Sequence, residues 1–275
     1  MNRKLYFLTK IYQSICILRI NRVKYIYIKI GSVNEMNKKL KKILLIIICV
    51  VGLLFGGAYW YVSDYYHADT TVISLNNQNM IYDEEIEGYV LKPQGETKKG
   101  IIFYPGAKVD ELAYEPLMQK LSQQGYLCIL AKMPFHFAVL KVNAADSMIA
   151  KYKDIKEWYM MGHSLGGAMA AQYTSSHLND IQGLILLGAY STEDLSSSSL
   201  KVVSIYGSED HVLNHEKYQK SYSLLPKSTK EMIIMGGNHA QFGNYGHQSG
   251  DGQATISSQQ QQNQTVQFIL QSIQD

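Results

Sequence analysis

Along this chain, one long apolar run gives way to short apolar runs separated by polar stretches. The long run, residues 43–62, contains no charged side chain and has about the length that a helix needs to cross a bilayer. Four lysines lie just before it, at positions 38, 39, 41 and 42, whereas Asp64 and Asp69 follow it. Because basic side chains stay on the cytoplasmic side of a span, this pattern predicts a cytoplasmic N-terminus and a larger C-terminal part outside the cell membrane.

A cleaved signal peptide would show the same basic start and apolar core. The run is longer than a typical signal core, however, and no A-x-A-like cleavage site follows it, so we favour an uncleaved single-pass anchor. Residues 1–42 then form a basic cytoplasmic segment, and residues 63–77 form a connector. Because residues 1–35 are rich in Ile and Tyr and are followed by Met36, we also hypothesise that native translation starts at Met36.

From residue 78 to residue 275 the short apolar runs predict a single α/β domain. Runs at 80–82 and 88–91 predict an early hairpin, and the later runs alternate with helical stretches, which is typical of β-α-β units around a mostly parallel sheet. We expect about eight strands flanked by helices, without an insertion long enough for a separate lid domain. The later strands are expected at 101–104, 127–130, 158–161, 184–187, 202–205 and 232–235, and the helices at about 113–124, 138–152, 165–177, 214–223 and from 259.

Charge divides the chain into two unlike parts. The formal net charge is +3, but residues 1–62 contain 11 of the 26 basic side chains and only one of the 23 acidic ones. The remaining residues, 63–275, carry 15 basic and 22 acidic side chains and thus a net charge of −7. Such an acidic part lacks the basic field that binding to a phosphate backbone needs, so no nucleic acid partner is expected.

The pentapeptide Gly162-His163-Ser164-Leu165-Gly166 fits a G-x-S-x-G nucleophile elbow. An apolar run typical of a buried strand precedes it, and the small residues 167–171, typical of a tightly packed helix, follow it. The sharp turn between such elements lifts a serine hydroxyl clear of the sheet, and only small residues two positions on either side leave room for it. The alternative is an ordinary Gly/Ser turn, but the flanking elements favour Ser164 as a nucleophile.

A serine nucleophile needs a base to take its proton and an acid to orient that base. In a fold of this kind both follow the serine, each on a loop after a later strand. Asp210 follows the strand expected at 202–205, with Glu209 as a second candidate acid, and His239 follows the strand expected at 232–235. An acid that caps a helix and a loop histidine with no catalytic role are the alternatives.

Developing negative charge on the substrate oxygen needs two backbone N–H donors. The residue after the nucleophile, Leu165, provides one of them. The loop after the third strand provides the other, and we choose Ala107, with Gly106 permitting a close approach.

Three other features carry no predicted chemistry. His211 and His215 are spaced i, i+4 but lack an H-E-x-x-H glutamate or a third ligand, so no metal is expected, and no cofactor either. Cys128 stands in an apolar run and is expected to be a small buried hydrophobe. The Gln-rich stretch 258–264 is expected to be an exposed helix start.

Several blocks of the sequence together resemble the α/β-hydrolase superfamily, in particular its small lidless bacterial branch related to dienelactone hydrolases, often called alpha/beta hydrolase fold-5. The resemblance covers about residues 78–274. It implies the α/β-hydrolase fold, Ser164, Asp210 and His239 as a catalytic triad, and tethering to the outside of a bacterial membrane. The blocks are Tyr104–Asp110, Lys132–Phe135, Gly162–Ala168, Ser204–Gly207, Gly236–Gly243 and Gly250–Gly252.

Dienelactone hydrolases proper use cysteine where this chain has Ser164, which favours ester chemistry. We therefore expect a membrane-tethered serine hydrolase that cleaves small carboxylic esters through an acyl-enzyme, in a pocket lined by loops such as 133–137 and 189–190. Two alternatives stay open. One is an acyltransferase or peptidase acting on an envelope component, and the other is a surface binding module without activity.

Overall fold

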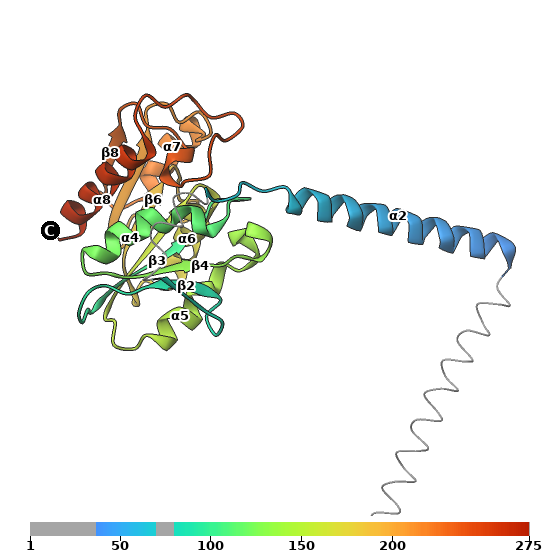
Figure 1. The fold of residues 1–275 in the computed structure, drawn as a ribbon, viewed down its shortest axis with the longest axis horizontal. Coiled ribbons are helices and arrows are strands. Elements are labelled where there is room, and N and C mark those ends of the chain that lie inside the picture. Colours follow the sequence, from blue (N-terminus) through green and yellow to red (C-terminus); the bar gives the residue numbers. More distant parts are fainter. Residues whose placement is uncertain (1–36, 70–79, 275) are drawn as a thin grey trace, which may run out of the picture. The chain divides into compact units, whose positions relative to one another are not determined.

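A computed structural model describes residues 37–69 and 80–274 (Figure 1). The chain divides between Tyr61 and Val62 into two compact units. Helix α2, Lys38–Ser63, has no buried side chain, and its apolar window reaches a mean hydropathy of 2.5. It is long and apolar enough to cross a membrane, as the sequence pattern predicted. The proposed start at Met36 and part of the expected connector lie outside the described residues.

The second unit is built on one eight-stranded sheet, which confirms the predicted fold class (Figure 1). Its strand order is β1-β2-β4-β3-β5-β6-β7-β8. Strands β1 and β2 form the expected antiparallel hairpin, β2 pairs antiparallel with β4, and all later pairs are parallel. The strands are β1 Met80–Asp83, β2 Gly88–Leu91, β3 Lys99–Tyr104, β4 Leu127–Ala131, β5 Glu157–His163, β6 Ile181–Leu187, β7 Lys201–Gly207 and β8 Lys230–Ile234.

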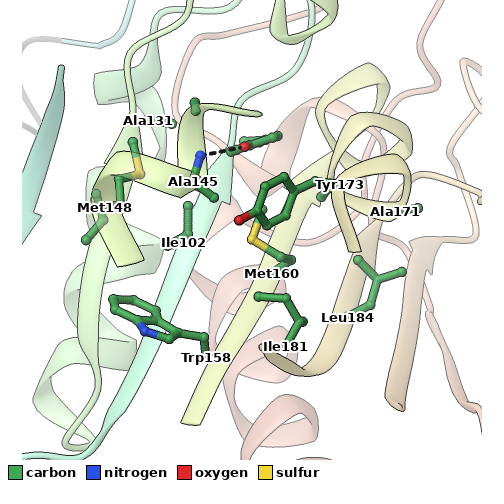
Figure 2. Close-up of a cluster of buried hydrophobic side chains, with 14 of the residues drawn as sticks. Ile102, Ala131, Ala145, Met148, Trp158, Met160, Ala171, Tyr173, Ile181 and Leu184 are labelled. Atoms are coloured by element: carbon green, nitrogen blue, oxygen red, sulfur yellow. Dashed lines mark hydrogen bonds between the residues drawn. The ribbon is translucent and has the colours of Figure 1, made fainter. Parts of the chain in front are cut away.

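Helices cover both faces of this sheet because alternate strand residues point to opposite sides. On one face Ile102, Met160 and Leu184 pack with side chains of α5 and α6 (Figure 2). On the other, Ile101, Phe103 and Ile185 pack with α4 and α8. The helices are η1 Glu111–Tyr114, α4 Glu115–Gln123, η2 Pro134–His136, η3 Ala138–Leu140, η4 Val142–Ala144, α5 Ala145–Lys151, α6 Leu165–Ser176, α7 His215–Ser221, η5 Tyr222–Leu224, η6 Ala240–Phe242 and α8 Ser258–Gln274.

One sequence prediction about helices was wrong, and another was incomplete. The helix expected at 138–152 is broken into short turns, and regular helix begins only at Ala145. The buried Tyr104 hydroxyl donates to Val142 O and accepts from Ala145 N, and these bonds fix the turn before α5. The start of α8 was expected to be exposed, and Gln259 and Gln260 are exposed as expected. Gln261 and Gln262, however, are buried, and Gln261 bonds to the backbone of Asn238.

Candidate active site

The predicted site residues follow three parallel strands of the sheet at their carboxyl ends, with β6 lying between the first two of these strands. Strand β5 ends at His163 directly before Ser164, β7 ends at Gly207 three residues before Asp210, and β8 ends at Ile234 five residues before His239. Parallel strands bring their carboxyl ends to one edge of the sheet, where loops form binding crevices. The local order of the chain therefore explains why these three residues gather.

Ser164 occupies a strained turn of the kind that the sequence predicted. Its backbone has φ 52° and ψ −127°, in a region that L-residues rarely adopt. The two glycines beside it have no room for a side chain. A Cβ on Gly162 would lie 2.5 Å from the carbonyl of Gly166, and a Cβ on Gly166 would lie 2.2 Å from Tyr104 O. The close approach of α6 to β3 and β5 thus requires glycine on both sides of the serine.

The structure brings Asp210 and His239 together in a fully buried pair. Asp210 Oδ2 lies 2.8 Å from His239 Nδ1, and both side chains are almost completely shielded from solvent. The other carboxylate oxygen accepts hydrogen bonds from Val212 N at 3.0 Å and Leu213 N at 2.8 Å. With a proton on Nδ1 shared with the carboxylate, Nε2 of a neutral imidazole is the acceptor. Asp210 thus fixes the orientation and the tautomer that a general base needs.

Glu209, the second candidate acid, is directed elsewhere. Its Oε1 accepts a hydrogen bond from Ser208 Oγ at 2.9 Å, and its backbone N–H donates to Gly237 O. Among the described residues, its carboxylate makes no contact with His239. The geometry therefore distinguishes the two neighbouring acids in favour of Asp210.

Ser164 and His239 line the same pocket, which has a volume of about 350 Å³. His239 Nε2 is buried and has no hydrogen-bond partner among the described residues, so it does not bond to the serine hydroxyl in this state. Ala189 and Tyr190 line the pocket, as predicted. Residues 133–137, all of which the structure describes, do not line it, so that prediction was wrong. The other lining residues are Leu165, Ala168, Met169, Gly188, Thr192, Val212, Leu213 and Asn214.

The two predicted oxyanion donors differ in position. Leu165 lines the pocket, at the start of α6, whereas Ala107 is not among the lining residues. Neither amide N–H is hydrogen-bonded to an acceptor in the part of the chain that the structure describes. The neighbours of Ala107 are held on both sides, because Gly106 N donates to Tyr114 Oη at 3.2 Å and Lys108 N donates to His136 O at 2.9 Å. The loop therefore leaves Ala107 N available between two anchored positions.

Sequence reasoning missed a glycine that makes room for the acid and the histidine. Gly188, at the end of β6, has φ 50°, and a Cβ there would lie 2.9 Å from His239 Nδ1 and 3.0 Å from Asp210 Oδ2. It lies between the strand expected at 184–187 and the loop expected at 189–190, and neither expectation included it. No short motif marks such a position, because the close approach involves residues more than twenty positions away.

A second missed group holds the loop of His239. Asp251 accepts hydrogen bonds from His239 N at 3.2 Å and Ala240 N at 2.9 Å, and Gln261 bonds to both N and O of Asn238. These side chains satisfy buried backbone groups on either side of the histidine. The block Gly250–Gly252 in the family resemblance was the signal that could have identified Asp251.

His163, residue x of the elbow, packs beneath the site. Its Nδ1 is 2.8 Å from the Tyr114 hydroxyl, and its ring centre is 4.4 Å from that of His239. Complete burial, with a smaller contribution from His239, holds the pKa of His163 well below its ordinary value, so the ring is neutral near pH 7. A neutral ring avoids placing a second cation beside His239 when that residue becomes protonated.

Among the described residues, no group of three or more His, Cys, Asp or Glu side chains is arranged to hold a metal ion. Cys128 is buried in the core, and burial raises the pKa of its thiol. This placement agrees with the expected role as a small core residue.

Comparison with known proteins identifies one family whose sequence model matches this chain. A sequence model described as the Alpha/beta hydrolase family matches residues 100–263, more than half of the chain. No curated protein sequence matches.

Several solved structures share the fold. Est1E from Butyrivibrio proteoclasticus is 15% identical, with a TM-score of 0.53 over 68% of this chain and 94% of that chain. TT1662 from Thermus thermophilus is 11% identical, with a TM-score of 0.51 over 71% and 98%. A protein described as a predicted CIB-like hydrolase from Thermoplasma acidophilum is 14% identical, with a TM-score of 0.50 over 69% and 96%. At such low identity, the likeness concerns the fold.

Proposed function

The chain belongs to the alpha/beta hydrolase family, and from this premise and the geometry of the site we propose that it is a serine hydrolase of carboxylic esters. The observation that carries the proposal is the buried pair of Asp210 and His239, because His239 lines the same pocket as Ser164 and its Nε2 has no hydrogen-bond partner among the described residues. The strained elbow around Ser164 supports it, because such strain persists where function requires it.

In the proposed reaction, His239 Nε2 takes the proton of Ser164 as the serine oxygen attacks the ester carbonyl carbon. The negative charge that forms on the carbonyl oxygen is stabilised by the N–H groups of Leu165 and Ala107. The bond to the leaving alcohol then breaks, and the proton on His239 passes to the alcohol oxygen. An acyl group remains on Ser164.

Water completes the cycle by the same steps. His239 takes a proton from a water molecule as its oxygen attacks the acyl carbon, and the proton then returns to Ser164 as the carboxylic acid leaves. Asp210 stays ionised throughout and stabilises the imidazolium ion through Nδ1. No cofactor is needed for any of these steps.

The pocket supports a small, partly apolar substrate. Leu165, Met169, Val212 and Leu213 give it apolar walls, and its volume of about 350 Å³ lies at the low end of small-molecule sites. We further propose that α2 is a single-pass anchor with its N-terminus in the cytoplasm and the hydrolase domain outside. The four lysines in the first turns of α2, at positions 38, 39, 41 and 42, and the acidic residues after α2 support this orientation.

The proposal is tested with p-nitrophenyl esters of graded acyl length, using the full chain in detergent micelles. We expect turnover of short and medium acyl esters, and we expect Ser164→Ala to abolish it, with Ser176→Ala, an exposed serine of the same helix, as the matched control. Turnover that survives Ser164→Ala would contradict the mechanism. A chain that hydrolyses none of the esters and is not labelled by a serine-reactive probe would instead be the binding module.

A further inference from the structure

Three large apolar side chains are exposed together on the second unit. Phe135, Val139 and Leu140 are 60%, 52% and 58% exposed, and they lie within six residues of one another on η2 and η3. We call these three residues the apolar lip. Exposed apolar side chains are common singly, but a group of them marks a surface that contacts another apolar phase.

The lip is held outward by strained backbone. Phe135 and His136 have φ of 52° and 59°, and Lys108, whose N–H donates to His136 O, has φ 58°. These are three of the five non-glycine residues with positive φ in the described chain. Glu111 Oε2 lies 3.3 Å from His136 Nδ1, without a hydrogen bond between the two atoms. Strain of this kind persists only where the surrounding contacts impose it, so the exposure of Phe135 is built into the fold.

The chain that follows α2 docks beside the lip. Tyr66 N donates to Lys108 O at 2.7 Å, and Asp110 N donates to Tyr66 O at 2.9 Å, which makes one parallel bridge. Tyr65 stacks on the ring of His136 with ring centres 4.0 Å apart. Asp64 Oδ2 accepts a hydrogen bond from Lys108 Nζ at 3.1 Å. Tyr65, the third residue after Val62, thus already fixes the connector beside His136, which is next to Phe135 in the chain.

Chain length then limits how far the lip can lie from a membrane. Ser63 is the last residue of α2, and Tyr65 is two residues further along, which an extended chain spans in at most about 7 Å. Shortly before Ser63 the chain has three aromatic residues of the kind that is typical of a bilayer interface, Tyr59, Trp60 and Tyr61. An anchored domain therefore keeps the residues around His136 close to the lipid headgroups.

We propose that the apolar lip rests in the outer interfacial layer of the membrane that α2 crosses, so that the hydrolase domain has a fixed lipid-facing surface. This inference rests on the anchor proposed above and is independent of the catalytic chemistry. Burial of the lip in the interface removes its apolar area from water, and the rigid attachment of Tyr65 and Tyr66 makes one orientation of the domain favourable. The partner is the lipid surface itself.

The test places a fluorescent label on the lip in the full chain. Cys16 and Cys49 are replaced by Ser, buried Cys128 is kept, and NBD is attached to Leu140→Cys. The matched control is Leu178→Cys, also an exposed leucine, just beyond the carboxyl end of α6. Both proteins are reconstituted in vesicles of phosphatidylcholine and phosphatidylglycerol, with and without a nitroxide on the acyl chains.

We expect the nitroxide to quench the label at position 140 and to leave the label at position 178 bright. Adding Val139→Asp should abolish the quenching at 140 while hydrolysis of a soluble ester is unchanged, because a carboxylate at the lip opposes insertion. Equal quenching at both positions, or quenching that survives Val139→Asp, would overturn the inference. So would a change at position 140 that depends on protein concentration and not on the nitroxide, since that would indicate contact between copies.

Flotation of the vesicles after an alkaline wash separates the two proposals. A chain that does not float overturns the anchor and the lip together. A chain that floats but is not quenched at 140 overturns the lip alone, and neither result affects the assignment of Ser164.

Discussion

The two halves of the candidate site differ in how completely the fold satisfies their polar groups. In the acid half, comprising Asp210, Asp251 and the Nδ1 side of His239, the Asp210 carboxylate accepts hydrogen bonds from two backbone N–H groups and from the imidazole. In the nucleophile half, comprising Ser164, Leu165, Ala107 and the Nε2 side of His239, neither Nε2 nor the two amides have a partner among the described residues.

This difference indicates which part of the site the protein completes by itself. His239 Nε2 is buried without a partner, and leaving such an atom unpaired costs about 1–3 kcal/mol, a cost that a bound ligand would remove. The groups left over here are the ones that a reacting ester would use, with Nε2 to take a proton and the two N–H groups to bind an oxyanion. The hydrogen bonds of the acid half are therefore already formed, and in the proposed reaction the substrate would complete those of the nucleophile half.

Breaking the acid half should have the largest effect. Asp210→Asn keeps the size of the side chain but replaces an oxygen facing Nδ1 or the backbone donors, so the imidazole loses its orienting acceptor and favours the wrong tautomer. We expect kcat to fall on the order of 10⁴-fold. Glu209→Gln is the matched control and should leave kcat unchanged. Comparable losses in both variants would remove the distinction between the two acids.

Asp210 also differs from Glu115, a second buried acid, because no hydrogen-bond donor among the described residues contacts the carboxyl group of Glu115. Both carboxyl oxygens of Glu115 are buried without a partner in the described chain, and burial raises the pKa of this group from its usual 4.5 to about 7. Below about pH 4.5 the group is protonated both folded and unfolded, so it imposes no penalty. As the pH rises from about 4.5 to about 7, the unfolded state ionises while the folded state stays protonated, and the protein loses up to about 3 kcal/mol of stability, a loss that is complete above pH 7.

Glu115→Gln should therefore raise the free energy of unfolding at about pH 8 by up to about 3 kcal/mol and change it little at about pH 4, where the carboxyl group is protonated in both states. Denaturant midpoints at the two pH values measure this difference. Glu216→Gln, at an exposed position paired with Lys220, is the control. A stability gain that is equal at both pH values would show that Glu115 does not titrate as described.

Gly188→Ala tests the space that the acid half needs. The added Cβ would press on His239 and Asp210, so we expect kcat to fall about 10²-fold through misplacement of the imidazole. Gly95→Ala shares the positive φ, here 84°, but its Cβ would meet no atom within 4 Å. Both variants should lose similar stability from backbone strain, and only Gly188→Ala should lose activity. Full activity in Gly188→Ala would contradict the role of close packing.

Asp251→Asn should give the smallest loss, because Asp251 holds the backbone around His239 and touches no reacting atom. One of its two acceptor oxygens becomes a donor facing His239 N or Ala240 N. We expect kcat to fall about tenfold, the cost of one lost hydrogen bond to a charged group, with KM unchanged. The exposed residue Asp180 provides the control variant Asp180→Asn. A rise in KM with constant kcat would assign Asp251 to substrate binding instead.

Local patterns in the sequence were sufficient for the fold and for the positions of the site loops. Short apolar runs located the strands, and the two glycines of the elbow indicated the strained turn at Ser164. The order of strands along the chain then pointed to Asp210 and His239, since residues that follow parallel strands share one edge. Their roles in catalysis stay predictions.

What the sequence could not provide were contacts between distant segments. Gly188 is required by atoms of Asp210 and His239, and α8, whose start looked like a solvated glutamine tract, supplies Gln261 to the histidine loop. Residues 133–137 were expected in the pocket but anchor the loop beside Ala107 through His136 O. Composition and periodicity report burial and element type, and neither identifies a hydrogen-bond partner across the fold.

The central claim is that Ser164 is the nucleophile that His239 activates, and covalent labelling tests it most directly. The full chain is treated with a fluorophosphonate, digested, and analysed by mass spectrometry to locate the adduct. We expect one adduct on the peptide that contains Ser164, no labelling of Ser164→Ala, and much slower labelling of Asp210→Asn. An adduct on a different serine, or labelling that persists in Ser164→Ala, would contradict it.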